Sequence, residues 1–167
     1  DKASALGVSF DAINATLSTA LASAPDLPLP ADLATSNLAA QLRLVARMIA
    51  SRDALGARRQ VFFVSLGGFD THDDQLTTQP GLHTQLGAAL AYFYNATVSL
   101  GVANNVTTFT GSDFGRTLTS NGDGSDHGWG SHHFVLGGSV LGQRYYGTFP
   151  IMGLNNKIGR ASCRERV

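Results

Sequence analysis

The chain has 167 residues, of which 43% are hydrophobic and 14% are charged, and its formal net charge at pH 7 is zero. This length is sufficient for one domain with a hydrophobic core of its own. The neutral charge balance gives no electrostatic reason to expect a nucleic-acid partner, and no apolar run is long enough to span a membrane.

The start of the chain is abrupt, because Asp1 is not an initiator methionine and no signal peptide follows it. We expect an internal fragment of a longer protein, with any targeting segment outside it. Residues 1–35 are predicted to be irregular or weakly helical. Phe10, Ile13 and Leu17 have helical spacing, whereas the three prolines between residues 25 and 30 exclude regular structure because each fixes φ and lacks an N–H.

Two helices are predicted from the spacing of apolar residues. The first covers Ser36–Leu55, where Ser36 can cap the start and Gly56 suits the residue after the end. The second covers Pro80–Leu100 and ends at Gly101. Apolar residues recur every three or four positions in both helices, which places them on one face of each. In the first helix these residues are Leu38, Leu42, Val45 and Ile49.

Two apolar runs flank the second helix. Val61–Leu66 is almost continuously apolar, which favours a central strand of a parallel sheet, and Val106–Thr110 is predicted as the next strand. Strand, helix and strand in this order indicate a right-handed βαβ unit. The fold class is therefore α/β, with a mostly parallel sheet flanked by helices. Short apolar pieces between residues 134 and 147 suggest a small hairpin or an irregular flap.

Aspartate and histidine follow both predicted strands. Asp70 and His72 come after the first strand, and Asp113 comes after the second. The carboxyl ends of parallel strands lie at the same edge of a sheet, so we expect these side chains to converge there. His127, with Asp126 beside it, can close the site from the following loop. Carboxylate and imidazole together suit a divalent ion such as Zn²⁺, Mn²⁺ or Fe²⁺.

Simpler interpretations exist for each of these residues. An Asp-x-His pattern arises often by chance, and an aspartate after a strand can merely cap a turn. His132 and His133 are adjacent, so on extended backbone they point opposite ways and only one of them can face the site. His83 lies within the second predicted helix, where a structural role is expected.

Arg116 follows Asp113 closely, at the mouth of the predicted site. A guanidinium at this position can pair with the phosphate or sulfate of a ligand. It can equally orient Asp113 or Asp126. Both roles remain open from the sequence.

The last ten residues, Ile158–Val167, differ in character from the rest of the chain. Their peptide can be encoded by DNA that resembles the reverse complement of a common short-read sequencing adapter. We interpret this segment as an artefact and leave it out of the fold; the alternative is a natural basic tail. Without it, nine Lys and Arg and eleven Asp remain, the net charge becomes −2, and the only cysteine, Cys163, is lost.

Four segments together resemble a bacterial family called domain of unknown function 1501: GGFDTHDDQ, VTTFTGSDFGRTL, NGDGSDHGWGSHHF and GGSVLGQRYYG. The resemblance covers roughly Leu38–Pro150. This family is placed by fold similarity in the alkaline phosphatase and sulfatase superfamily, whose fold is a mostly parallel sheet between helices. Residues 36–157 would then be the C-terminal part of an alkaline-phosphatase-like domain. Members of the family are typically exported, often with a twin-arginine signal.

The resemblance also implies roles for individual residues. Active members of the superfamily hold two metal ions with Asp and His, and they attack with a Ser or Thr or, in sulfatases, a modified residue. Asp70 and His72 match the pair that serves one metal, and His127, or His132, would complete it. Asp113 matches the strand-end ligand of the other metal, although Asp126 is an alternative.

Two further implications concern residues that this chain does not share with active members. Active members usually have His directly after the strand-end Asp, where this chain has Phe114. The nucleophile and another metal-binding Asp would precede Asp1, so we expect the fragment alone to be inactive.

Two functional hypotheses follow. The first is a fragment of an exported, periplasmic or cell-envelope hydrolase of phosphate or sulfate esters, which uses one or two Zn or Mn ions and acts on a small-molecule or glycan ester. The second is a non-catalytic exported protein of the same fold that binds a metal, a glycan or an envelope partner. A weaker third hypothesis, based on Asp70 and His72 alone, is a mononuclear metal hydrolase of another superfamily.

Overall fold

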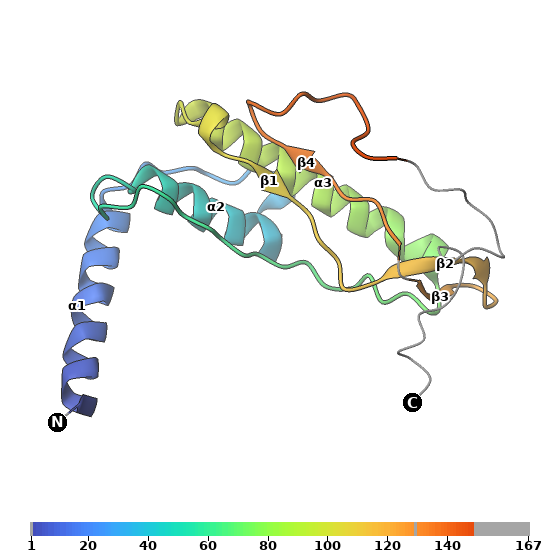
Figure 1. Cartoon of the computed structure of the whole chain (residues 1–167), viewed down its shortest axis with the longest axis horizontal. Helices are drawn as coiled ribbons and strands as arrows, with labels where there is room; N and C mark the ends of the chain where they lie inside the picture. Colours follow the sequence, from blue (N-terminus) through green and yellow to red (C-terminus); the bar gives the residue numbers. More distant parts are fainter. Residues whose placement is uncertain (1, 129, 149–167) are drawn as a thin grey trace. The chain divides into compact units, whose positions relative to one another are not determined.

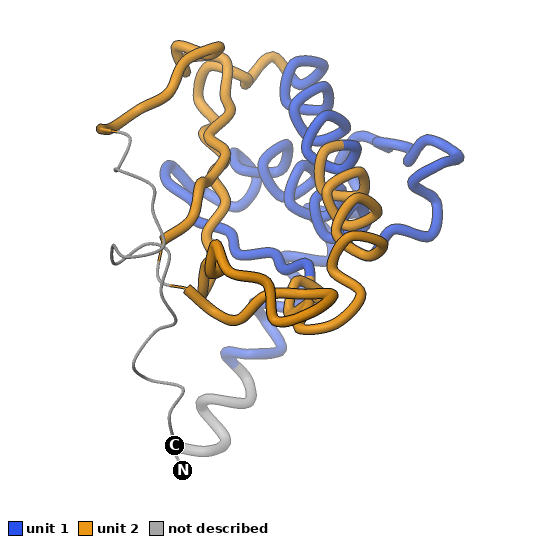
Figure 2. The backbone as a smooth tube through the Cα atoms, turned by 90° about the vertical axis from the view of Figure 1, so that its right-hand side faces the viewer, with its two compact units in different colours: residues 1–66, 88–100 blue, residues 67–87, 101–167 orange. Residues whose placement is uncertain are grey.

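The computed structural model describes residues 2–128 and 130–148 (Figure 1). The predicted artefact, Ile158–Val167, lies outside the described residues, and so do the last residues of the predicted domain before it. The chain divides into two compact units (Figure 2). The helical unit consists of Asp1–Leu66 and Ala88–Leu100, and the hairpin unit consists of Gly67–Gly87 and Gly101–Val167. Within the described part of the chain, no helix combines the length and the hydrophobicity needed to cross a membrane.

Helix α1, Lys2–Ala22, begins the helical unit. Phe10 and Ile13 are 64% and 61% exposed, so the apolar spacing seen in the sequence does not produce a buried face at this end. The last turn of α1 is fixed to the next helix instead. Arg47 Nη2 donates to the Leu21 carbonyl at 2.6 Å, and Ser51 Oγ donates to the Ala20 carbonyl at 3.0 Å. These bonds give side-chain partners to carbonyl groups in the last turn, where a helix lacks its regular backbone donors.

Helix α2, Asn37–Ala50, confirms the first predicted helix and the predicted cap. The backbone N–H of Ala39 donates to Ser36 Oγ at 3.2 Å. The helix ends earlier than predicted, and residues 51–56 continue as turns. Its buried face provides much of the core of the helical unit and includes Leu38, Ala39, Leu42, Val45, Ala46 and Ile49.

Helix α3, Gln75–Ser99, contributes its first half to the hairpin unit and its second half to the helical unit. It begins five residues before the predicted start, with Pro80 inside the helix. The Asp74 carbonyl accepts from the N–H groups of Thr77 and Thr78 at 3.2 and 3.0 Å, which starts the helix before the proline is reached. Pro80 then costs one backbone hydrogen bond. The buried residues in the second half are Ala89, Phe93, Ala96 and Thr97.

The predicted strand Val61–Leu66 is not assigned as a strand, and its side chains alternate between exposed and half-buried. Val61 and Phe63 are 99% and 93% exposed. The side-chain amide of Gln41 donates to the Ser65 carbonyl at 3.1 Å and accepts from the Ser65 N–H at 3.1 Å, as a neighbouring strand would. Among the described residues this segment belongs to no sheet, so its pairing in a parallel sheet stays a prediction.

The two sheets of the described residues are small and antiparallel, and both lie in the hairpin unit. After the short helix η2, Ala103–Asn105, strand β1, Thr108–Phe109, pairs with β4, Val135–Leu136. Strand β2, Gly115–Ser120, pairs with β3, Ser125–Gly128, and its register shifts between Arg116 and Ser120. These sheets do not test the mostly parallel, alkaline-phosphatase-like sheet, which stays a prediction.

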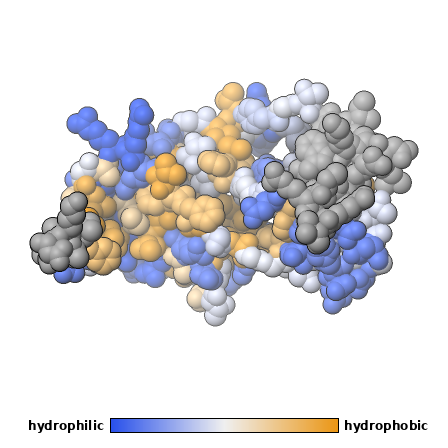
Figure 3. Space-filling model, turned by 60° about the horizontal axis from the view of Figure 1, so that its bottom comes forward, coloured by the Kyte–Doolittle hydropathy of each residue, from blue (hydrophilic) through white to orange (hydrophobic). Residues whose placement is uncertain are grey.

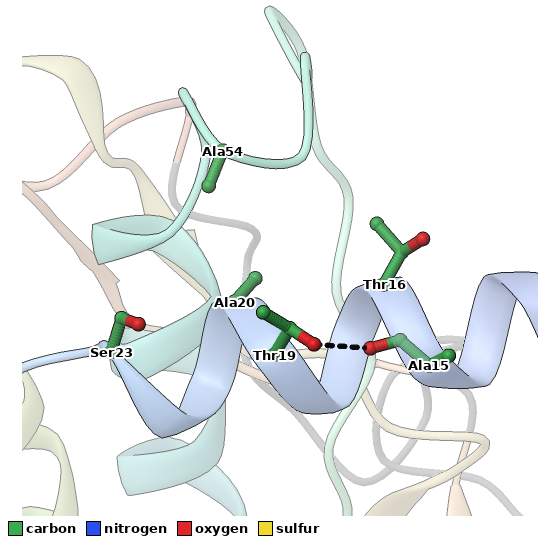
Figure 4. Close-up of a pocket in the computed structure, with 6 residues that line it drawn as sticks. All are labelled: Ala15, Thr16, Thr19, Ala20, Ser23 and Ala54. Carbon is green, nitrogen blue, oxygen red and sulfur yellow. Dashed lines mark hydrogen bonds between the residues drawn. The ribbon is translucent and has the colours of Figure 1, made fainter.

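Some large apolar side chains are exposed, and the helical unit contains a cavity. Figure 3 shows hydrophobic residues, in orange, exposed among hydrophilic ones. In the helical unit, a cavity of about 420 Å³ lies beside the end of α1, where Thr19 Oγ1 donates to the Ala15 carbonyl at 2.9 Å (Figure 4). No ionisable side chain lines this cavity, so it offers no group for acid–base or metal chemistry. Its lining residues are Ala15, Thr16, Thr19, Ala20, Ser23 and Ala54.

Candidate metal centre

The loop between Gly67 and α3 carries the first two candidate ligands, Asp70 and His72. Thr71 lies between them and is buried, with 5% of its surface exposed. Its N–H donates to the Phe69 carbonyl at 2.9 Å, and its Oγ1 accepts from Gln79 Nε2 of α3 at 3.3 Å. On either side of the buried Thr71, Asp70 is exposed and His72 is half-buried.

The β2–β3 hairpin supplies the third ligand and covers this loop. Arg116 and His127 are direct partners in its register. The turn of the hairpin approaches the loop so closely that a Cβ added to Gly124 would collide with the His72 carbonyl. Only glycine permits this approach. The start of α3 fixes the same turn, since Ser125 Oγ donates to Gln75 Oε1 at 2.6 Å.

Asp70, His72 and His127 come together in the hairpin unit, each with one ligand atom within 4.8 Å of the others. Asp70 Oδ1 lies 2.7 Å from His127 Nε2 and 3.1 Å from His72 Nε2. The side chains of Asp70, His72 and His127 are 63%, 42% and 15% exposed, respectively. The cluster therefore combines one well-fixed imidazole with a carboxylate that is open to solvent.

Phe114 fixes the His127 ring. The two rings are stacked, with centroids 3.8 Å apart and planes only 6° from parallel. The His72 ring also packs against His127, with ring centroids 4.8 Å apart and planes tilted by 31°. At the position where the resemblance leads one to expect a histidine ligand, this chain has Phe114, which packs on the candidate ligand His127.

The surroundings of Asp70 favour its ionised form. The hydrogen bond from His127 holds the pKa of the Asp70 carboxyl below its ordinary value of 3.8, and the nearby charges of His127, His72 and Arg116 act in the same direction. Partial burial acts in the opposite direction with a smaller effect. Asp70 is therefore a carboxylate at neutral pH, which is the state that binds a metal ion.

Arg116 directs its guanidinium at the backbone of the site. Nη1 donates to the Ser125 carbonyl at 2.5 Å, and Nη2 donates to the Phe69 carbonyl at 2.6 Å and lies 3.4 Å from Asp70 Oδ1. The sequence suggested Asp113 or Asp126 as the carboxylate that Arg116 orients, whereas the carboxylate beside its guanidinium is that of Asp70. Its contact with an anionic ligand stays a prediction.

The remaining predicted ligands are placed differently. Asp126 Oδ1 lies 3.5 Å from His72 Nδ1, on the ring nitrogen that does not face Asp70. Asp113 and His132 are exposed and do not belong to the group formed by Asp70, His72 and His127. His83 also lies outside this group, and its ring meets Phe69 edge-on at 5.5 Å.

Sequence reasoning missed Asn121. Its amide nitrogen donates to the His72 carbonyl at 3.1 Å and to Asp126 Oδ1 at 3.4 Å. The pair Asn121-Gly122 signals a hairpin turn, which is the only indication that the sequence gives. The contacts themselves depend on the loop that this turn covers, and no local pattern reveals them.

The geometry of the three donors fits a divalent ion. Zinc is held at about 2.0–2.1 Å by imidazole nitrogen and carboxylate oxygen, so ligand atoms around a tetrahedral ion lie roughly 3.3 Å apart. The separations of 2.7 and 3.1 Å between Asp70 Oδ1 and the two histidine nitrogens are close to this spacing, and all three ligand atoms lie within 4.8 Å of one another. Three protein ligands leave a further position for water or substrate, as catalytic zinc sites do.

Comparison with known proteins gives one match. The family model described as "Protein of unknown function (DUF1501)" matches residues 12–164. No curated protein and no solved structure matches the chain. Its chemistry must therefore be argued from the geometry of the site.

Proposed function

We propose that this chain, which belongs to the family described as protein of unknown function (DUF1501), forms the metal centre of a hydrolase of phosphate or sulfate esters. The observation that carries the proposal is the convergence of Asp70, His72 and His127. Two imidazoles and one carboxylate suit Zn²⁺ or Mn²⁺. Export to the periplasm or cell envelope belongs to the same proposal and is supported by the resemblance to exported proteins.

The chain's own residues hold and prepare the site. Asp70 Oδ1 stands between the two histidine nitrogens and is held ionised, so it provides the negative charge that a cation requires. Stacking on Phe114 fixes His127 from behind. When bound, a divalent ion supplies Lewis-acid polarisation of the ester and lowers the pKa of a bound water. The exposed side of Asp70 leaves that water or an ester room to approach.

One ion is the number that the described cluster supports directly. A second ion would need Asp113, or residues outside this chain, because Asp113 is not part of the group. An anionic ester would also meet Arg116, whose charge lies 3.4 Å from Asp70 Oδ1. The guanidinium of Arg116 already donates to two carbonyl groups. It would therefore attract an anionic ester through its charge and not through a bidentate pair of hydrogen bonds.

The metal centre is tested by metal content. Zinc bound per chain is measured by mass spectrometry for the wild type and for Asp70→Ala, His127→Ala and His83→Ala. We expect one equivalent in the wild type, loss in the first two variants and retention in His83→Ala, which serves as the matched control. Binding should weaken as pH falls through the ordinary histidine range near ~6.5, because imidazole must lose its proton to bind. Equal metal content in all four proteins contradicts the site.

The hydrolase assignment needs a separate test in the longer protein that the sequence predicts. Aryl phosphate and aryl sulfate turnover is measured with added Zn²⁺ or Mn²⁺. Turnover of either ester that depends on the metal and disappears in Asp70→Ala supports the assignment. A fully metal-loaded protein with no turnover of either ester contradicts it.

One observation favours a non-catalytic role as the second candidate. Substrate sites are usually concave and bury most of their ligand, yet the side chain of Asp70, the carboxylate of the cluster, is 63% exposed. A protein that keeps the metal and binds a glycan or envelope partner would need no cavity at the cluster. Metal binding without turnover is the result that this alternative predicts.

A further inference from the structure

We infer that Asp126 is a positioning residue, not a metal ligand, and that it sets the orientation of His72. This inference rests on the proposed metal centre. The two nitrogens of the His72 ring face different carboxylates. Nε2 lies 3.1 Å from Asp70 Oδ1 and Nδ1 lies 3.5 Å from Asp126 Oδ1. An ion held by Asp70 and His72 Nε2 therefore lies on the opposite side of the ring from Asp126.

The chemistry of imidazole gives this arrangement a function. A neutral imidazole has one N–H, and its other nitrogen carries the lone pair that binds a metal. A carboxylate beside Nδ1 holds the proton there, which leaves the lone pair on Nε2. Carboxylates that bind the second nitrogen of a metal-binding histidine fix its tautomer and ring orientation and raise its basicity.

Asn121 supports Asp126 in this position. Its Nδ2 donates to Asp126 Oδ1 at 3.4 Å and to the His72 carbonyl at 3.1 Å, so one side chain joins the carboxylate to the backbone of the residue that it orients. Its Oδ1 accepts from the Gly124 N–H at 3.1 Å, which fixes the amide itself. The hairpin turn and the His72 loop thereby form one hydrogen-bonded unit.

Asp126 and His127 are adjacent on one strand, so the same strand contacts both histidines of the cluster. Strand β3 carries His127, a proposed ligand, and the adjacent Asp126 orients the other histidine. His72 has greater need of such support than His127, because it lies on a loop and its side chain is 42% exposed, against 15% for His127. His127 is stacked on Phe114, whereas the support for His72 comes from Asp126.

The first measurement uses the chain with one equivalent of zinc added, because without an ion Asp70 Oδ1, 3.1 Å from Nε2, competes with Asp126 for the same proton. Histidine ring ¹⁵N chemical shifts are recorded at about pH 8, above the ordinary histidine range near ~6.5, and the His72 signals are assigned by comparison with His72→Gln. With zinc at Nε2 in place of a proton shared with Asp70, we expect a predominant Nδ1–H form in the wild type and a shift toward a mixture in Asp126→Ala. Asp126→Asn should keep the wild-type tautomer, since its amide oxygen can accept from Nδ1–H in place of the carboxylate oxygen. Asp123→Ala, in the same hairpin turn, is the matched control and should change nothing.

The second measurement is the zinc affinity, by competition with a chelator. We expect Asp126→Ala to weaken binding about 10- to 100-fold, the usual effect of removing a residue that supports a ligand, with Asp126→Asn closer to the wild type. Zinc loss in Asp126→Ala as complete as in Asp70→Ala would make Asp126 a ligand and overturn the inference. An unchanged His72 tautomer in Asp126→Ala would overturn it as well.

The two measurements separate this inference from the proposed function. If the wild type binds no zinc but its His72 tautomer depends on Asp126, the metal centre fails while the orienting contact stands. If zinc binds at Asp70 and His127 and the tautomer does not depend on Asp126, the metal centre stands and the inference fails. Far-UV circular dichroism of each variant confirms that the comparison is made between folded proteins.

Discussion

Replacement of Arg116 tests whether this residue stabilises the site structurally or binds an anionic substrate. In the structure, its guanidinium joins the loop of Asp70 to the β2–β3 hairpin through the carbonyls of Phe69 and Ser125. Its side chain is 15% exposed. The informative variants are Arg116→Met, which removes the charge and all donors, and Arg116→Lys, which keeps the charge but replaces the planar fork by one ammonium group.

The expected magnitude follows from these contacts. A hydrogen bond that involves a charged group contributes roughly 1.5–3 kcal/mol. Arg116→Met loses two of them, but water can reach part of the vacated space, so we expect the free energy of unfolding to fall by about 2–4 kcal/mol. Arg116→Lys cannot reach both carbonyls from one nitrogen, so we expect it to lose at least ~1.5 kcal/mol. Zinc affinity should fall about 10-fold in both variants because Asp70 loses its support.

The assay is urea unfolding together with zinc competition, with Arg59→Met as the control. Arg59 is exposed in the helical unit, and substitutions at such positions change stability by no more than about 0.5 kcal/mol. The reasoning is refuted if Arg116→Lys keeps wild-type stability and zinc affinity. That result, with a raised KM for an anionic ester, would make Arg116 a contact for the substrate instead.

Three further predictions concern single residues. Gly124→Ala should weaken zinc binding in the competition assay and lower the unfolding midpoint, because the new Cβ collides with the His72 carbonyl; Gly142→Ala, where no atom lies within 4 Å of an added Cβ, should do neither. The pKa of Asp70 is lowered, so its ionised form stabilises the fold above the ordinary pKa of 3.8, and this contribution is lost as pH falls through the lowered value. The urea midpoints of the wild type and Asp70→Asn should therefore converge below pH 3.8. A difference between the two midpoints that stays constant with pH would contradict the assignment. Ser36→Ala removes the α2 cap and should lower the free energy of unfolding by about 0.5–2 kcal/mol, while an unchanged value would show that the bond to Ala39 contributes nothing.

The helices were predictable because their signals are local. The buried face of α2 and its Ser36 cap depend on residues close together in the sequence, and the structure contains both. The start of α3 was placed too late because proline favours the first turn of a helix. In this chain the first turn forms earlier, where the Asp74 carbonyl accepts two N–H groups and Gln75 bonds to the hairpin turn. That second contact joins residues 50 positions apart, and no local rule includes it.

The predicted first strand shows why strand pairing is harder to predict than strand conformation. Val61–Leu66 alternates between exposed and half-buried side chains, which is the pattern of a strand. Its apolar composition indicated cover on both faces, yet Val61 and Phe63 are almost fully exposed. Composition reports that a segment suits a sheet, whereas its neighbours are set by distant parts of the chain. Gln41, which bonds to both backbone groups of Ser65, was not identifiable from its place on a helix.

For the candidate site, residue type was a better guide than position along the predicted sheet. Asp70, His72 and His127 were all selected from the sequence, and the structure brings them together. His127 was expected on the loop after the second strand, and it arrives on strand β3 of an antiparallel hairpin. Asp113 was selected by its place after a strand, and it lies outside the group.

The two histidines of the cluster are held by different physical means, and this difference predicts which part of the site a bound ion would order. His127 is fixed by its stacking on Phe114 and its place on β3. His72 depends on polar contacts to Asp126 and Asn121, which water can replace more readily because these groups are exposed. A ligand that binds only the folded site stabilises what it contacts by mass action. The ordering effect of a bound ion should therefore fall mainly on the loop around His72, while the hairpin around His127 keeps its arrangement without the ion.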